Sequence, residues 1–141
     1  MRFWDASALV PLVVEQSYSP KAAAWMKEGS AVFVWWASQV ECASAIERLV
    51  REGKLSNEGR MQAYSRLERM RGEWEEIDPS PRVRENAMRF LKVHPLKSAD
   101  ALQLAAAFVA SEQSPPSLEF VSFDERLCGV ASKEGFRVWS E

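Results

Sequence analysis

Short apolar runs alternate along the chain with longer segments of helical spacing, and polar turns separate them. Apolar, β-prone runs predict strands near 2–4, 31–36, 118–121 and 136–139, with a weaker edge strand at 74–77. The run 31–36 is apolar at every position, as expected for a strand covered on both faces of a parallel sheet. The intervening spacing predicts helices near 7–14, 19–29, 38–51, 56–72, 80–94, from 98 onward and 125–134. This alternation predicts an α/β fold around a parallel sheet.

Serine residues stand at the predicted starts of several helices, where a hydroxyl caps free backbone N–H groups. Ser7, Ser38 and Ser98 are predicted caps of this kind. Pro11 fits only the first turn of its helix, where the missing N–H costs little. Helical spacing in 38–51 predicts a buried stripe of Val40, Ala43, Ile46, Leu49 and Val50. In 80–94 the predicted inward residues are Val83, Ala87, Phe90 and Leu91.

The length of 141 residues predicts a single domain over 1–141. Hydrophobic residues make up 47% of the chain, which is enough for a core, and no apolar run reaches the length of a membrane span. The first residues do not follow the pattern of a secretory signal. Cys42 and Cys128 lie in apolar helical patterns without CxxC spacing, so we expect buried thiols. These features favour a reducing, cytoplasmic setting.

The net charge of -2 does not by itself indicate a polyanionic partner. Its distribution is uneven, because 12 of the 18 Lys and Arg residues lie between Arg48 and Lys97, against 8 acids in that span. Two interpretations remain open. The segment forms either a basic face for nucleic acid or an ordinary solvated helix surface.

Acidic residues occur where predicted strands give way to helices. Asp5 and Asp124 each follow an apolar strand, Glu41 lies in the first turn after the strand 31–36, and Asp100 opens an Ala- and Leu-rich helix. Each has an ordinary explanation as a helix cap, and Ser38 with Glu41 matches a capping box. Turns at the carboxyl ends of parallel strands meet at one edge of the sheet, so the four acids can also converge.

Four converging carboxylates would repel one another and raise their pKa values, and a divalent cation would remove that penalty. Mg²⁺ and Mn²⁺ prefer oxygen ligands of this kind and support phosphodiester hydrolysis. The rest of the sequence narrows the alternatives. His94 is the only histidine and cannot supply the acid–base pair of a metal-free ribonuclease, and there is no Gly-rich phosphate loop or GxSxG motif.

Four pieces of the sequence, in order from end to end, resemble the PIN-domain family, and most of all VapC-type toxin ribonucleases of bacterial and archaeal toxin–antitoxin pairs. The pieces are FWDASALV, Ser38-Gln39-Val40-Glu41, SADALQLAAA and FVSFDERL. The resemblance implies a three-layer α/β/α sandwich, an endoribonuclease dependent on Mg²⁺ or Mn²⁺, a homodimer, and inhibition by a small antitoxin.

The resemblance also assigns residues by position. It implies that the acidic, metal-binding quartet is Asp5, Glu41, Asp100 and Asp124, and that Ser7 and Ser122 are supporting hydroxyls that hold the site or a metal-bound water. Pro11 departs from the family, whose members usually continue this helix with a polar or basic residue, and it affects local geometry without touching the ligands.

Other functions remain open from the sequence. Asp5 could act as an aspartyl nucleophile in phosphoryl transfer, although that chemistry uses a second acid two residues on, where this chain has Ser7. A housekeeping RNA-processing nuclease would carry the same residues. A binding module is a third interpretation, in which the helix 56–72 helps to form a groove for an amphipathic helix through Met61, Tyr64, Leu67 and Met70.

Overall fold

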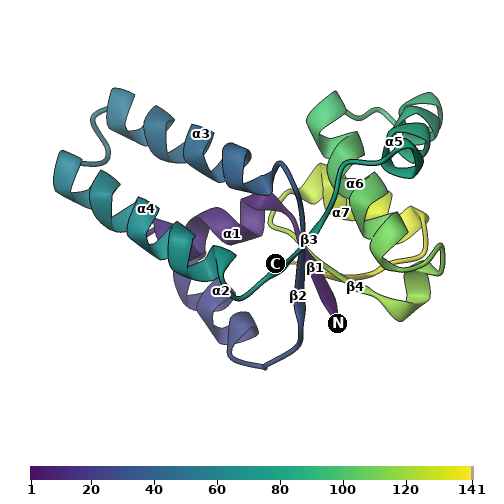
Figure 1. Cartoon of the computed structure of the whole chain (residues 1–141), viewed down its shortest axis with the longest axis horizontal. Coiled ribbons are helices and arrows are strands. Elements are labelled where there is room, and N and C mark those ends of the chain that lie inside the picture. The colour runs from purple at the N-terminus through teal and green to yellow at the C-terminus, as the bar shows by residue number, and fades with distance from the viewer. Residues whose placement is uncertain (141) are drawn as a thin grey trace.

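The computed structural model describes residues 1–140, in which seven α-helices surround a five-stranded sheet (Figure 1). The strands are β1 (Arg2–Trp4), β2 (Val32–Trp35), β3 (Glu75–Ile77), β4 (Glu119–Val121) and β5 (Arg137–Trp139). The helices are α1 (Ala6–Val13), α2 (Ser19–Met26), α3 (Ser38–Arg51), α4 (Asn57–Arg71), α5 (Pro81–Val93), α6 (Ser98–Ala110) and α7 (Glu125–Lys133). A short 3-10 turn, Pro115–Ser117, precedes β4.

All strand pairs are parallel, and the order across the sheet is β3-β2-β1-β4-β5. The chain moves from β1 toward β2 and β3, and then crosses back to β4 on the other side of β1. Since right-handed crossovers in opposite directions place helices on opposite faces, α1–α4 cover one face and α5–α7 the other (Figure 1). The carboxyl ends of β1 and β4 therefore flank the switch point at which such sheets bind ligands.

The core consists of two layers divided by the sheet. Phe3, Trp35 and Phe120 point to the α5–α7 side, whereas Trp4 and Val34 point to the α1–α4 side. The alternation follows from the two-residue period of a strand. The expected α/β/α sandwich with a central parallel sheet is confirmed, together with every predicted strand.

Three of the predicted helix caps are wrong. The N-cap residues of α1, α3 and α6 are Asp5, Ala37 and Lys97, and none of them forms a side-chain cap hydrogen bond. Ser7 and Ser38 lie inside the first turn and their hydroxyls bind the side chains of Asp5 and Gln103 instead, while Ser98 is the first helical residue. The caps at Ser56, Ser80 and Asp124 do form, each accepting from a backbone N–H three residues on.

The buried stripe of α3 also differs from the prediction. The residues buried on α3 are Ser38, Cys42, Ala45 and Ile46, whereas Val40 is 65% exposed. The stripe is shifted because the helix turns Ser38 and Glu41 toward α6, where both accept from Gln103. Pro11 lies in the sixth helical position and not in the first turn, and it is buried. Leu91, which was predicted to face inward, is exposed, and so is Met61 of the predicted apolar face of 56–72.

Much of the basic segment pairs with acids. Arg48, Lys54, Arg60, Arg71 and Arg89 each lie within 4.0 Å of a glutamate oxygen. These exposed ion pairs favour the solvated helix surface over a continuous basic face. Both cysteines are buried and free, as predicted. No helix among residues 1–140 has the length and apolar character needed to cross a membrane.

Candidate metal centre

Asp5 directly follows β1 and lies at the centre of the carboxyl edge of the sheet. Asp5 is only 4% exposed, and its backbone N–H donates to the carbonyl of Val121 at the end of β4. Burial raises the pKa of the Asp5 carboxyl to about 7, and the charge of Asp124 raises it further, against hydrogen bonds from Ser7 and Ser122. A carboxylate that is costly to keep charged therefore sits at the switch point of the fold.

A chain of hydroxyls joins Asp5 to the loop after β4. Ser7 Oγ donates to Asp5 Oδ1 at 2.7 Å and accepts from the backbone N–H of Phe123 at 2.9 Å. Ser7 Oγ and Ser122 Oγ lie 3.1 Å apart, within hydrogen-bond distance. Ser122 Oγ in turn accepts from the backbone N–H of Asp124 at 3.0 Å. These bonds fix the relative positions of Asp5 and Asp124 across 119 residues of chain.

Glu41 is held by a residue of α6. Its Oε2 accepts from Gln103 Nε2 at 2.6 Å, and the same amide group donates to Ser38 Oγ at 3.0 Å. Burial raises the pKa of Glu41, the bond from Gln103 opposes this, and the charge of Asp100 adds to the rise. The capping-box alternative is wrong, because the Glu41 side chain turns to α6 and not to the Ser38 amide.

Asp100 and Asp124 complete the set from the other side of the sheet. Burial raises the pKa of Asp100, followed by the charge of Asp124, while Lys97 and Arg126 lower it. Asp124 Oδ1 accepts from the backbone N–H of Leu127 at 3.1 Å and so caps α7. The acids are therefore linked in pairs by charge, because Asp124 raises the pKa values of Asp5 and Asp100, and Asp100 raises the pKa of Glu41.

Cys42 lies close to two of these acids. Burial raises the pKa of its thiol to about 12, and the charges of Glu41 and Asp5 contribute to the rise. The thiol is therefore protonated at neutral pH and packs as a small apolar side chain.

The charge balance of this cluster fits a bound cation. Among residues 1–140, none of the four carboxyls takes part in an ion pair with a basic side chain. Gln103 Oε1 is buried there without a hydrogen-bond donor. Buried negative charge and a buried free acceptor are costly unless something compensates them. The donor atoms are oxygens, which Mg²⁺ and Mn²⁺ prefer.

The side chains are not arranged as a closed coordination shell. Over the described residues, no three His, Cys, Asp or Glu side chains are grouped so as to hold a metal ion as they stand. Two of the acids are engaged elsewhere, because Glu41 accepts from Gln103 and Asp124 caps α7. The cluster thus has the residue types and charge of a metal centre, with its ligands partly satisfied by the protein.

Gln103, Lys97 and Arg126 were not singled out by sequence reasoning. Gln103 is 1% exposed and lies one turn after Asp100 on α6. It is the one polar residue after the first turn of this Ala- and Leu-rich helix, and that pattern could have identified it. Lys97 and Arg126 are exposed and near enough to Asp100 to affect its pKa. They supply positive charge beside Asp100 at this edge.

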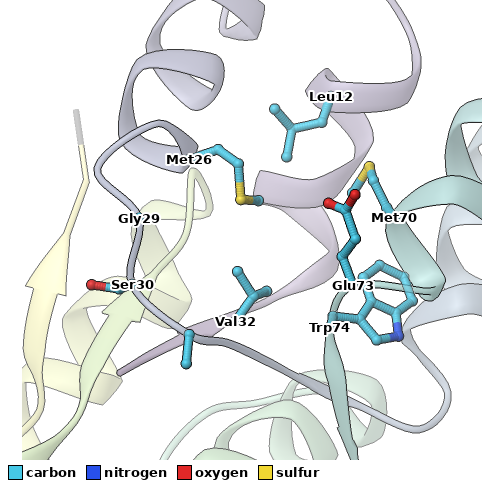
Figure 2. A pocket seen from close by; sticks show the side chains of 9 residues that line it. Leu12, Met26, Gly29, Ser30, Val32, Met70, Glu73 and Trp74 are labelled. Atoms are coloured by element: carbon cyan, nitrogen blue, oxygen red, sulfur yellow. The ribbon is translucent and has the colours of Figure 1, made fainter.

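A separate hollow lies at the opposite edge, where β2 begins. It has a volume of about 660 Å³, and Figure 2 shows Leu12, Met26, Met70 and Trp74 around it, with the Glu73 carboxylate on one side. Its walls come from α1, α2, the start of β2 and the end of α4. The predicted contribution of the helix 56–72 to an apolar groove thus has a counterpart at Met70, while Met61 is 74% exposed and does not line it.

Comparisons with known proteins agree with this architecture. Three solved structures share the fold. A toxin–antitoxin complex from Klebsiella pneumoniae has 16% identity and a TM-score of 0.64, and the match covers 92% of this chain and 92% of that chain. FitAcB from Neisseria gonorrhoeae has 16% identity and a TM-score of 0.66, covering 99% and 96%. VapBC2 from Rickettsia felis, bound to a DNA fragment from its promoter, has 11% identity and a TM-score of 0.66, covering 99% and 98%.

These identities are low, so the solved structures show a common fold. No curated protein sequence matches the chain. The profile of the PIN domain family, however, matches residues 2–133 and includes all four acids. The chain therefore belongs to the PIN domain family.

Proposed function

We propose that residues 1–141 form a single PIN domain that acts as an endoribonuclease dependent on Mg²⁺ or Mn²⁺, the toxin of a toxin–antitoxin pair. The observation that carries the proposal is the buried Asp5 carboxyl, which has no cationic partner and is linked electrostatically to Asp124. Toxin–antitoxin assemblies among the structures of the same fold support the biological role. A housekeeping RNA-processing nuclease is the alternative with the same site.

In this proposal Asp5, Glu41, Asp100 and Asp124 hold the cation. A divalent cation supplies charge neutralisation at the phosphate and a water of lowered pKa. Ser7 fixes the orientation of the Asp5 carboxyl, and Gln103 does the same for Glu41. Lys97 and Arg126 offer positive charge to the RNA backbone.

Cleavage of RNA tests the proposal. We expect Asp100→Asn to lower the rate of RNA cleavage in Mn²⁺ by about 100-fold or more, because even residues that only support a metal ligand contribute about 10- to 100-fold. The measurement is the rate of fragment formation from a structured RNA with the purified chain. Asp78→Asn is the matched control, since Asp78 also follows a strand at this edge but is exposed.

An Asp100→Asn protein that cleaves as fast as the native one would contradict the proposal. Loss of activity in Asp78→Asn to the same extent would show that the effect is not specific to the cluster. Titration calorimetry with Mn²⁺ separates a nuclease from a binding module, because a module without metal gives no heat. A trapped phosphoryl group on Asp5 would favour the aspartyl nucleophile instead.

We propose that the partner is a small antitoxin whose apolar side chains occupy the hollow at the start of β2. The walls around Met70 and Trp74 are apolar, and the Glu73 carboxylate complements a basic residue beside them (Figure 2). An amphipathic helix that places apolar anchors in such a groove is a common mode of recognition.

The partner surface is tested with two substitutions on one helix. We expect Met70→Glu to weaken the complex with the protein encoded by a neighbouring small reading frame by about 10- to 100-fold, because a buried apolar anchor would meet a charge. Met61→Glu is the control, because Met61 is 74% exposed and outside the hollow. Co-purification and titration calorimetry measure both. Equal loss, or no loss, in the two variants would place the partner elsewhere.

The proposal includes a homodimer in the cytoplasm. Apolar side chains exposed on this chain are available to a second copy, among them Trp36, Val40, Met88 and Val93. The two reduced, buried cysteines agree with a reducing compartment.

A further inference from the structure

Trp36 is a large aromatic side chain exposed at the carboxyl edge of the sheet. It directly follows β2 and is 51% exposed, whereas tryptophan is usually well buried. Among residues 1–140 its ring has no stacked, edge-on or cation contact with another side chain. An open aromatic surface therefore lies at the edge where sheets of this kind bind their ligands.

The register of the strands places Trp36 beside the acids. Continuing the pairing of β1 with β2 puts Asp5 level with Trp35, so Trp36 is one residue further along. The N–H of Trp36 donates to the carbonyl of Ile77, which keeps this residue in line with β2. Since neighbouring strands are about 4.8 Å apart, the backbone of Trp36 lies next to that of Asp5.

An arginine of α5 lies near the end of the next strand. Arg84 lines a cavity of about 290 Å³ together with Trp35, the last residue of β2, and Pro79, which follows β3. It is the one charged side chain among the described residues that line this cavity. Arg84 is exposed, and among residues 1–140 it takes part in no ion pair. Its guanidinium is therefore free to bind an anion near the ends of β2 and β3.

These contacts follow the order of the strands across the sheet. Asp124 and Asp5 lie at the ends of β4 and β1, Trp36 lies at the end of β2, and Arg84 lies beside the end of β3. Proteins that bind single-stranded nucleic acid combine cations along the backbone with aromatic side chains on which bases stack. A strand that crosses this edge from the acids toward β3 meets an aromatic ring first and a guanidinium next.

The apolar surface at Trp36 suits a single ring better than a second copy of the chain. Val40, one turn into α3, is 65% exposed and extends this surface. The exposed line of α3 then continues with Ser44 and Arg48, which are polar. A stable protein interface takes about 800 Å² from each partner, far more than two side chains offer. The exposed apolar residues of α5 remain for a second copy.

We propose that Trp36 stacks on one unpaired nucleobase of the RNA whose phosphate lies at the acids, and that Arg84 binds a phosphate beyond that base. The inference rests on the proposed ribonuclease function and adds to it the path of a single strand along the carboxyl edge. The base is unpaired, because bases in loops and single strands are free to stack on a side chain. The contact tolerates any base, since every base has a π-face.

Binding of short RNAs tests the proposal without relying on cleavage. The probes are fluorescein-labelled oligo(A), oligo(U) and the duplex that these two strands form, titrated in Mg²⁺ with the Asp100→Asn protein and read by anisotropy. We expect Trp36→Leu in that protein to weaken binding of both single strands by about 10-fold, because one stacked base is lost. Binding of the duplex should not change. Trp36→Phe should keep most of the affinity, because it keeps an aromatic ring.

The contribution of Arg84 has a different signature. Arg84→Gln should weaken binding and reduce the slope of log affinity against log salt concentration by about 0.7, the value for one phosphate of a single strand. Trp36→Leu should leave this slope unchanged. The matched controls are Met61→Leu, at an exposed apolar residue of α4, and Arg137→Gln, at an exposed arginine on the opposite edge of the sheet. Neither control should change the affinity or the slope.

Unchanged binding of the single strands by Trp36→Leu would overturn the proposal, and so would equal losses in Trp36→Leu and Trp36→Phe. An unchanged salt slope in Arg84→Gln would overturn the phosphate contact. Analytical ultracentrifugation of Trp36→Leu detects the competing occupant. A native dimer that becomes a monomer in this variant would assign Trp36 to a second copy of the chain and overturn the proposal.

Cleavage by the native protein in Mn²⁺ is measured separately. If RNA is cleaved while binding does not depend on Trp36, only this inference fails. If single strands bind through Trp36 while no RNA is cleaved, the proposed nuclease function fails and the RNA-binding site stands.

Discussion

Asp5→Asn is expected to abolish RNA cleavage while making the metal-free protein more stable. Burial raises the pKa of Asp5 from 3.8 to about 7, so ionising this carboxyl in the fold at neutral pH costs on the order of 4 kcal/mol. Asparagine carries no charge, still accepts from Ser7 and is as good a residue at a helix N-cap. We therefore expect a gain of about 2–4 kcal/mol in the free energy of unfolding.

The gain should depend on pH in a definite direction. The folded-state pKa of Asp5 lies above the value of 3.8, so between about pH 4 and pH 7 the native protein binds a proton that the unfolded chain has released. The native protein therefore loses stability as the pH rises through this window. Asp5→Asn removes the loss, so its advantage should be small at pH 4 and complete at pH 8.

Thermal unfolding at the two pH values, in the presence of a chelator, measures this effect. We expect the midpoint of Asp5→Asn to exceed that of the native protein by about 5–10 °C at pH 8. Addition of Mn²⁺ should raise the native midpoint and leave the variant unchanged, because binding to the folded state alone stabilises it. A variant less stable than the native protein at pH 8 would show that Asp5 is compensated within the protein.

The sheet and the placement of the acids could be predicted because both follow from local patterns and a topological rule. Apolar runs such as 31–36 allow little besides a buried strand, and parallel strands point their carboxyl ends to one edge. Asp5 and Asp124 therefore had to approach each other once both followed neighbouring strands. Their chemical role stays a prediction, because the fold alone does not carry it.

The first residues of the helices were harder to predict than the strands, because tertiary contacts override local capping preferences. Ser38 and Ser7 have side chains that commonly cap helices. Here the Ser38 hydroxyl accepts from Gln103, and the Ser7 hydroxyl accepts from the backbone N–H of Phe123. Gln103 and its partner Glu41 are 62 residues apart, so no local pattern connects them. Ser7, Ser38 and Gln103 are thus polar residues whose tertiary contacts override local rules.

Gln103→Leu is expected to lower both stability and activity. Leucine keeps a similar volume in this fully buried position but removes the donors to Glu41 and Ser38. Each buried group left without its partner costs about 1–3 kcal/mol, so we expect a loss of about 2–4 kcal/mol in the free energy of unfolding. Cleavage should fall by about 10- to 100-fold, because Glu41 loses the contact that orients it.

The pH dependence of this loss identifies its cause. The bond from Gln103 lowers the pKa of Glu41, so it stabilises the ionised carboxylate. Without it the folded-state pKa of Glu41 rises further above 4.5, and the native state is penalised as the pH increases. Urea unfolding of the metal-free protein should therefore show a larger loss at pH 8 than at pH 4. Gln62→Leu, an exposed glutamine on α4, is the matched control and should show neither change. An equal loss at both pH values would mean that the contribution of Gln103 to stability does not depend on the charge of Glu41, and that the carboxylate of Glu41 is held in place by something else.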